Sequence, residues 1–150
     1  MTPAIKELQK AVHAWECSLH PTVPAAYIPI NNYTDKTANG LTKCIVDFIR
    51  ANGGQAERIN TTGMPMVRKL PSGRTDVTWR KGNTTKGSAD ISAIICGKSV
   101  KIEVKIGHDS QSEAQRRYEQ AVTSAGGYYF IAKDFDSFLA WYNEKFSINQ

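Results

Sequence analysis

Two short runs of alternating apolar and polar residues, 90–95 and 99–106, lie on either side of a Gly97-Lys98 pair. A repeat of two residues is typical of a β-strand with one apolar face and one polar face. The Gly-Lys pair suits a two-residue hairpin turn, so the segment predicts two adjacent antiparallel strands. Because the apolar face of such a pair must be covered, we expect helices packed against the sheet.

The predicted hairpin gathers charged side chains on its polar face. With this turn, Asp90 lies opposite Lys105, and Asp90 and Glu103 are diagonal neighbours with Cβ atoms about 7–8 Å apart. Two interpretations are open. The two carboxylates could share one divalent cation, because Mg²⁺ prefers oxygen ligands, with Lys105 stabilising charge that develops in a transition state. Alternatively, Asp90 and Lys105 form an exposed salt bridge, worth at most ~1 kcal/mol.

The rest of the chain predicts an α/β fold. Apolar stripes and end signals predict helices over 3–19, 37–51, 111–124 and 135–146, and further strands over 55–59, 75–80 and 128–132. The segment between 59 and 75 is predicted as a loop because it contains Pro and Gly. Ser110 and Glu113 match a capping box for the third helix. The stripe expected to be buried on that helix is Ala114, Tyr118, Ala121, Val122 and Ala125.

Size and composition limit the class of protein. A chain of 150 residues with 41% hydrophobic residues suits a single globular domain. We expect no membrane span and no secretory signal. The three cysteines, Cys17, Cys44 and Cys96, fit no metal-ligand spacing, so we expect partly buried, reduced thiols in a cytoplasmic protein.

The positive charge of the chain is concentrated in one segment. The net charge is +5, and residues 58–86 contain seven basic residues and a single acidic one. This distribution is expected of a protein that binds a polyanion. The basic residues that we expect to contact a nucleic-acid backbone are Arg68, Lys69, Arg74, Arg80, Lys81, Lys86 and, on the following helix, Arg116.

Four sequence motifs together resemble the PD-(D/E)XK nuclease superfamily, and within it the VRR-NUC (virus-type replication-repair nuclease) branch. They are KGSAD at 86–90, IEVK at 102–105, HDSQSEAQ at 108–115 and AGGYYFIA at 125–132. The resemblance implies a restriction-endonuclease-like core, a mixed β-sheet flanked by helices in the order αβββαβ. It implies a nuclease domain over 35–150, preceded by a helical extension over 1–34.

The resemblance also implies roles for individual residues. Asp90 and Glu103 match the metal-binding acids, and the backbone carbonyl of Val104 would complete the protein ligands to Mg²⁺ or Mn²⁺. Lys105 matches the catalytic lysine, and Gln115 matches the glutamine that arranges the site. The implied activity is metal-dependent hydrolysis of DNA phosphodiesters, with branched or four-way-junction DNA as the expected substrate in replication, repair or recombination.

One position departs from the family pattern. The family places a Glu near the start of the first core helix, whereas this chain reads TANGLTK at 37–43, with Asn39 or Gly40 at that point. Asn39 remains a candidate ligand through its amide oxygen, and Asp47 is expected on the solvent face. The missing carboxylate leaves open an alternative, a degenerate nuclease fold that binds nucleic acid without cleaving it.

The resemblance also bears on assembly. Small members of this family are often homodimers, and two sites related by symmetry would cut two strands. The apolar stripe of the first helix, which includes Ile5, Leu8, Val12 and Trp15, is either a packing face within the domain or a dimer interface.

Overall fold

The structure is a computed structural model of the chain, and it describes residues 2–59, 64–80 and 85–146. In this part of the chain the helices are α1 (Pro3–Leu19), the short 3₁₀ helix η1 (Ala25–Tyr27), α2 (Ala38–Ala51), α3 (Glu113–Ser124) and α4 (Phe135–Phe146). The strands are β1 (Gln55–Arg58), β2 (Met64–Lys69), β3 (Thr75–Arg80), β4 (Ile91–Ile95), β5 (Lys98–Val104) and β6 (Tyr128–Ala132). The predicted α/β class is confirmed.

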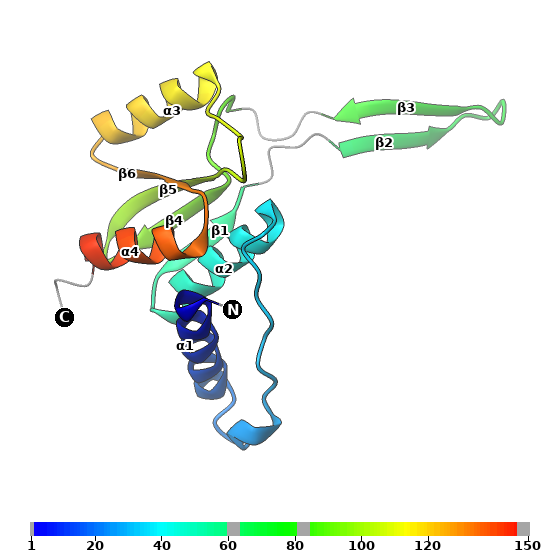
Figure 1. Cartoon of the computed structure of the whole chain (residues 1–150). Helices are drawn as coiled ribbons and strands as arrows, with labels where there is room; N and C mark the ends of the chain where they lie inside the picture. The colour runs from blue at the N-terminus through cyan, green and yellow to red at the C-terminus, as the bar shows by residue number, and fades with distance from the viewer. Residues whose placement is uncertain (1, 60–63, 81–84, 147–150) are drawn as a thin grey trace.

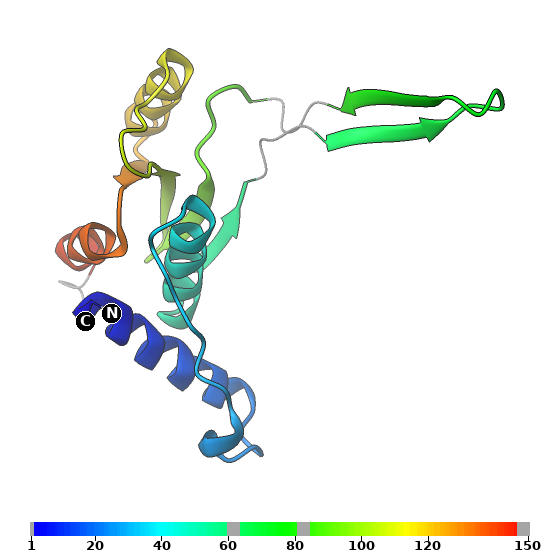
Figure 2. The same ribbon diagram turned by 45° about the vertical axis from the view of Figure 1, so that its right-hand side comes forward.

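A mixed four-stranded sheet forms the centre of the molecule. Its strand order is β1-β4-β5-β6, with antiparallel neighbours except for the parallel pair β5 and β6. Helices α1, α2 and α4 pack together on one face of the sheet, and α3, which connects the two parallel strands, lies on the other (Figures 1 and 2). The site described below lies between the sheet and α3.

The hydrophobic core lies between the sheet and the layer of α1, α2 and α4. The alternating apolar side chains of β4 and β5 are fully buried there, as the period of two predicts. Phe48 of α2 packs edge-on against Phe135 and Phe138 of α4. The stripe of α1 is buried in the same core, so it packs within the chain and is not free to form a dimer interface. The expected extension 1–34 therefore shares one core with the rest of the described chain.

The hairpin turn between β4 and β5 lies one residue earlier than predicted. Cys96 and Gly97 form the turn, both with positive φ (49° and 74°), and Ile95 pairs with Lys98. A tight hairpin turn of this kind needs positive φ at both central positions, and glycine occupies the second most readily. The prediction of Gly97-Lys98 was therefore wrong, and Asp90 is not opposite Lys105.

A second hairpin was missed by the sequence prediction. Residues 64–69 form strand β2, which pairs with β3 around a turn at 70–74 in which Gly73 has a φ of 78°. We name this β2–β3 ribbon the arm. It reaches away from the four-stranded sheet (Figures 1 and 2), and every residue from 65 to 79 is exposed. Strand β3 matches the predicted strand 75–80, whereas β2 lies in the segment that was predicted as a loop because it contains Pro and Gly.

Helix α3 also differs from its prediction. Its N-cap is Ser112 rather than Ser110, and the capping box pairs Ser112 with Gln115. No residue of α3 is fully buried, because the helix covers only part of one sheet face. Tyr118 and Val122 are half-buried as the stripe predicts, whereas Ala121 and Ala125 are exposed.

Two further expectations concern the cysteines and the membrane-spanning helices. Cys44 is buried and Cys17 half-buried, but Cys96 is exposed in the hairpin turn, and none of the three forms a disulfide. Within the described residues, no helix combines the length and the apolar character needed to cross a membrane.

Candidate active site

Four of the predicted site residues lie together where β4 begins and β5 ends, beneath the first turn of α3. Glu103 on β5 and Lys105 directly after it project toward α3 and are buried, with only 3% and 7% of their surfaces exposed. Lys105 Nζ lies 3.2 Å from Glu103 Oε1. Gln115 of α3 donates a hydrogen bond through Nε2 to the same oxygen. Asp90 is half-buried directly before β4.

Asp90 occupies the point at which the β4–β5 ladder stops. The last pair of the ladder is Ile91 with Ile102, so Asp90 and Glu103 follow it on opposite strands as direct neighbours rather than diagonal ones. Asp90 Oδ2 accepts a hydrogen bond of 2.9 Å from the Val104 N–H. In an extended strand the N–H and C=O of one residue point the same way. The Val104 carbonyl therefore also faces the side on which Asp90 lies.

Gln115 joins the start of α3 to the site. Its Oε1 accepts a hydrogen bond of 2.8 Å from the Ser112 N–H, and its own N–H donates to Ser112 Oγ at 3.2 Å. These bonds form the capping box. Because Oε1 serves the cap, the amide must direct Nε2 toward Glu103. One side chain thus caps α3 and fixes the Glu103 carboxylate.

The electrostatics of the pair follow from burial. Burial, together with the nearby charge of Asp90, raises the pKa of Glu103 to about 7, although Lys105 acts in the opposite direction. Burial lowers the pKa of Lys105, but the hydrogen bonds and charges of Glu103 and Asp109 outweigh it and leave the pKa raised. Lys105 is therefore a charged ammonium at neutral pH, beside a carboxyl group that titrates near neutrality.

Gly87 of the KGSAD motif allows the loop before β4 to approach α3 closely. Its φ is +80°, and a Cβ placed there would lie 2.4 Å from the carbonyl carbon and oxygen of Ala114 and 2.8 Å from the Gln115 nitrogen. Only glycine combines this backbone conformation with that contact. The glycine therefore sets the distance between the Asp90 loop and the helix that carries Gln115.

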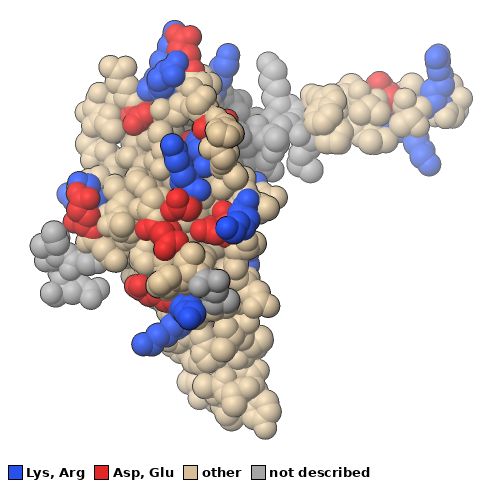
Figure 3. All heavy atoms as spheres, viewed as in Figure 1, with Lys and Arg blue, Asp and Glu red and all other residues tan. Residues whose placement is uncertain are grey.

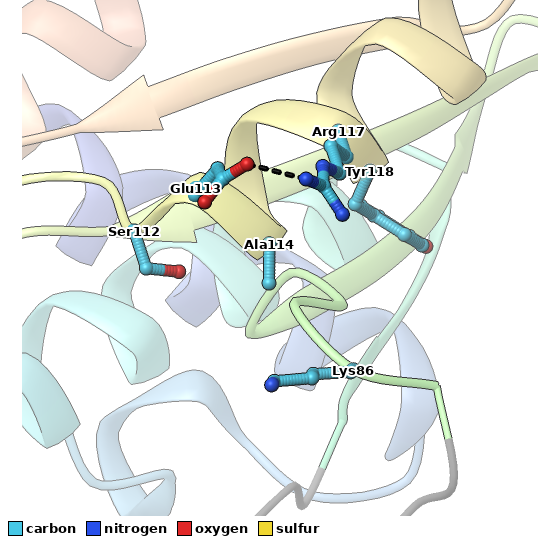
Figure 4. Close-up of a pocket in the computed structure, with 6 residues that line it drawn as sticks. All are labelled: Lys86, Ser112, Glu113, Ala114, Arg117 and Tyr118. Carbon is cyan, nitrogen blue, oxygen red and sulfur yellow. Dashed lines mark hydrogen bonds and ion pairs between the residues drawn. The ribbon is translucent and has the colours of Figure 1, made fainter.

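A cleft of about 550 Å³ lies beside the site, between this loop and the first turns of α3. Figure 4 shows Lys86 extending beneath α3, with Ser112 and Ala114 above it and Glu113 bonded to Arg117. Asp90 and Glu103 are not among its lining residues. Lys86 is exposed and lies near the site, as expected for a contact to a bound anion.

The other predicted residues have no hydrogen bond or ion pair with Glu103 in the described part of the chain. Asn39 is exposed in the first turn of α2, and none of the hydrogen bonds in the described part of the chain joins it to Asp90 or Glu103. Asp47 is half-buried and accepts a hydrogen bond from the Tyr33 hydroxyl, so it has a structural contact. Arg116 is exposed on α3, where it donates to the Gln111 carbonyl.

The predicted basic residues divide between the site and the arm. Arg68 and Lys69 lie on β2 and Arg74 in the turn beyond it, all exposed. Arg80 ends β3, and Lys81 lies outside the described residues. The structure therefore places most of this charge on the arm, while Lys86, in the described part of the loop before β4, lies beside the first turns of α3.

Two residues of the site were missed by sequence reasoning. Asp109 lies 3.4 Å from Lys105 Nζ through Oδ2, and Ser112 caps the helix. The S-x-x-Q spacing of Ser112 and Gln115 was a usable signal, since it matches a capping box as well as the S-x-x-E chosen. No sequence pattern indicated Asp109, because its contact with Lys105 depends on an irregular turn.

The donor set fits a hard divalent cation. Among the described residues, no three or more His, Cys, Asp or Glu side chains form a group that could hold a metal. A metal here would be held by the carboxylates of Asp90 and Glu103 and by the Val104 carbonyl. Glu103 Oε2 is buried and has no hydrogen-bond partner, which leaves one carboxylate oxygen free for a ligand. Such an all-oxygen set, completed by water, suits Mg²⁺ or Mn²⁺.

The sequence was compared with known protein families and with curated proteins. Neither the models of known protein families nor the curated proteins contain a match to this chain. The function must therefore be inferred from the residues and their geometry.

Comparing Gly87→Ala with Gly126→Ala should separate the cost of a left-handed backbone from the cost of the steric contact with α3. Gly126, which ends α3, also has positive φ (+84°) but has open space where a Cβ would lie. Gly126→Ala should lower the free energy of unfolding by about 1–2 kcal/mol for its left-handed backbone. Gly87→Ala should lose a further ~1–3 kcal/mol through overpacking against α3. Urea unfolding measures both, and equal losses would contradict the close contact.

The buried Glu103 should make stability fall with rising pH. The unfolded carboxyl group loses its proton near pH 4.5, while the folded one keeps it until about pH 7. The free energy of unfolding should therefore decrease across this interval, by about 3 kcal/mol at ~1.36 kcal/mol per pKa unit. Glu103→Gln removes this contribution, whereas Lys105, whose pKa is raised by Glu103 and Asp109, stays charged throughout.

Urea unfolding of the wild type and of Glu103→Gln between pH 4.5 and 8, in EDTA, tests this dependence. The stability of the variant should rise relative to the wild type as the pH increases. Glu57→Gln, which changes an exposed glutamate of β1, serves as the matched control and should parallel the wild type. A Glu103→Gln curve that also parallels the wild type would show that Glu103 titrates normally.

Proposed function

We propose that this protein is a metal-dependent DNA endonuclease of the PD-(D/E)XK superfamily, of the VRR-NUC type. One observation carries the proposal. Glu103 is buried between Lys105 and Gln115, opposite Asp90, and keeps one oxygen without a partner. A buried carboxylate with a free oxygen is a costly arrangement for stability, but it is suited to binding a cation.

The element order supports the same proposal. Without the arm, the chain from α2 to β6 runs helix, strand, strand, strand, helix, strand, which is the αβββαβ order of a restriction-endonuclease-like core. The sheet is antiparallel except for β5 and β6, and it is therefore mixed as that core requires. The arm is then an insertion between the first and second strands of the core.

The chain's own residues have distinct tasks in this proposal. A divalent cation, when bound, would polarise the scissile phosphodiester and activate water for attack. Asp90 and Glu103 supply the negative charge that binds the cation, and Gln115 keeps the Glu103 carboxylate in one orientation. The Lys105 ammonium, buried and anchored by Glu103 and Asp109, stabilises negative charge that develops on the phosphate. Arg116 and Lys86 lie exposed beside the site, where they can contact the DNA backbone.

A cleavage assay tests the activity. Purified protein is incubated with linear, flapped and four-way-junction DNA in Mg²⁺, Mn²⁺ or EDTA. The wild type should cut in either metal but not in EDTA, with branched DNA cut fastest. Asp90→Asn keeps an oxygen to accept the Val104 N–H but loses the charge, and it should reduce the rate by at least two orders of magnitude, about 10²-fold or more.

Two further variants complete the assay. Lys105→Gln retains a donor to Glu103 without the charge and should be equally impaired. Lys98→Gln removes an exposed lysine from β5, the strand that Lys105 follows, and should cut like the wild type. Metal-independent binding of DNA without cleavage by the wild type would refute the endonuclease and would favour the alternative, a degenerate module.

Metal binding can be measured without activity. Calorimetric titration of the wild type with Mn²⁺ should show one site per chain. Asp90→Asn should weaken this binding on the order of tenfold or more, because affinity depends on the charge of the ligands. Asp76→Asn, which alters an exposed aspartate on the arm, is the matched control. Equal Mn²⁺ affinity in all three proteins would place the metal elsewhere.

A further inference from the structure

The arm exposes an unusual amount of apolar surface. Trp79 is 71% exposed, Val67 65% and Val77 53%. In the β2–β3 register Val67 pairs with Val77, and Pro65 pairs with Trp79 two residues along. Side chains two residues apart lie on one face of a ribbon. These residues therefore form a single apolar face, which no described part of the chain covers.

A ribbon of this kind is poorly stabilised by itself. A two-stranded hairpin with no covered face is at best marginally stable in water. Nothing described in the chain packs on either side, since all residues from 65 to 79 are exposed. A partner that contacts the ribbon would remove the apolar face from water and add the stability that the arm lacks.

Charge indicates which partner the arm suits. Between residues 65 and 79 the chain has three basic residues, Arg68, Lys69 and Arg74, and one acidic residue, Asp76. Figure 3 shows basic side chains near the outer end of the arm and uncharged atoms along most of its length. A basic ribbon attracts a polyanion, whereas two copies of this arm, on chains of net charge +5, would repel one another.

The dimensions of the arm fit the same partner. A two-stranded ribbon has its strands ~4.8 Å apart, and six residues span about 20 Å. The major groove of DNA is about 12 Å wide and admits a two-stranded β-ribbon. The basic residues at the outer end would then reach phosphates, while the apolar face would contact base edges such as thymine methyl groups.

We propose that the arm is a DNA-binding element that lies in the major groove of a duplex next to the cleavage site. Arg68, Lys69 and Arg74 contact the backbone, and Trp79 with Val67 and Val77 forms the face against the bases. This inference rests on the proposed function for the identity of the polymer. It adds an element that binds duplex DNA away from Asp90 and Glu103, so that binding and cleavage use separate parts of the chain.

Fluorescence anisotropy with a labelled 30-base-pair duplex, in EDTA to prevent cleavage, tests the role of charge. The triple variant Arg68→Gln, Lys69→Gln, Arg74→Gln should bind on the order of 10²-fold more weakly at 0.1 M salt. Its log–log salt slope should be shallower by ~2.7, at ~0.9 per lost phosphate contact. The matched control Lys6→Gln, Lys10→Gln, Lys98→Gln removes the same charge from exposed residues elsewhere and should bind like the wild type.

The apolar face needs its own variant. Trp79→Ser should weaken binding by about tenfold without changing the salt slope, because it removes contact area but no charge. Tryptophan fluorescence of the wild type should be quenched by the duplex, and the quenching should be lost in Trp79→Phe. Equal DNA affinity for the arm triple variant and its control would overturn the inference.

Two further outcomes separate this inference from the proposed function. Wild-type cleavage combined with arm-independent binding would overturn the role of the arm alone. Arm-dependent binding without any wild-type cleavage would refute the endonuclease and support the arm. Analytical sedimentation tests whether a second copy of the chain covers the arm instead. A wild-type dimer that Trp79→Ser converts to a monomer would make the arm an interface between copies and would overturn the inference.

Discussion

The buried pair of Glu103 and Lys105 is the interaction on which the site depends. Replacing a buried ion pair with apolar residues of similar volume is often neutral or stabilising by ~1–4 kcal/mol. Here the pair is less favourable still, because Glu103 Oε2 has no partner and burial holds its pKa near 7. Folding stability alone does not account for such an arrangement. A ligand that takes up the free oxygen does account for it.

The surroundings of the pair show how the fold maintains it. Gln115 can hold Glu103 only because its own oxygen is committed to the cap of α3. The helix can lie that close only because Gly87 has no side chain against Ala114. The glycine, the cap and the carboxylate therefore form one connected unit, which explains in physical terms why the KGSAD and SEAQ motifs occur together with IEVK.

The sequence predicted which side chains share a face better than it predicted which ones pair. Moving the turn from Gly97-Lys98 to Cys96-Gly97 shifts the register by two residues, so every side chain keeps its face and only its cross-strand neighbour changes. Asp90, Glu103 and Lys105 thus meet as expected, although their pairing was wrong. Strand β3 of the arm was predicted, but its partner β2 was missed because Pro65, Pro71 and Gly73 gave that segment the composition of a loop. Asp109 was missed because an irregular turn leaves no pattern.

The two charged regions of the molecule differ in how strongly water and salt screen them. Arg68, Lys69 and Arg74 of the arm are exposed, so their attraction to a polyanion weakens over a Debye length of about 8 Å at physiological ionic strength. Glu103 and Lys105 are buried, where screening is slight and hydrogen bonds fix their positions. Exposed charge suits long-range, reversible binding, and buried charge suits the stabilisation of a reacting group in a fixed geometry. The fold therefore keeps the two requirements apart by placing the first on an arm outside the core and the second beneath α3.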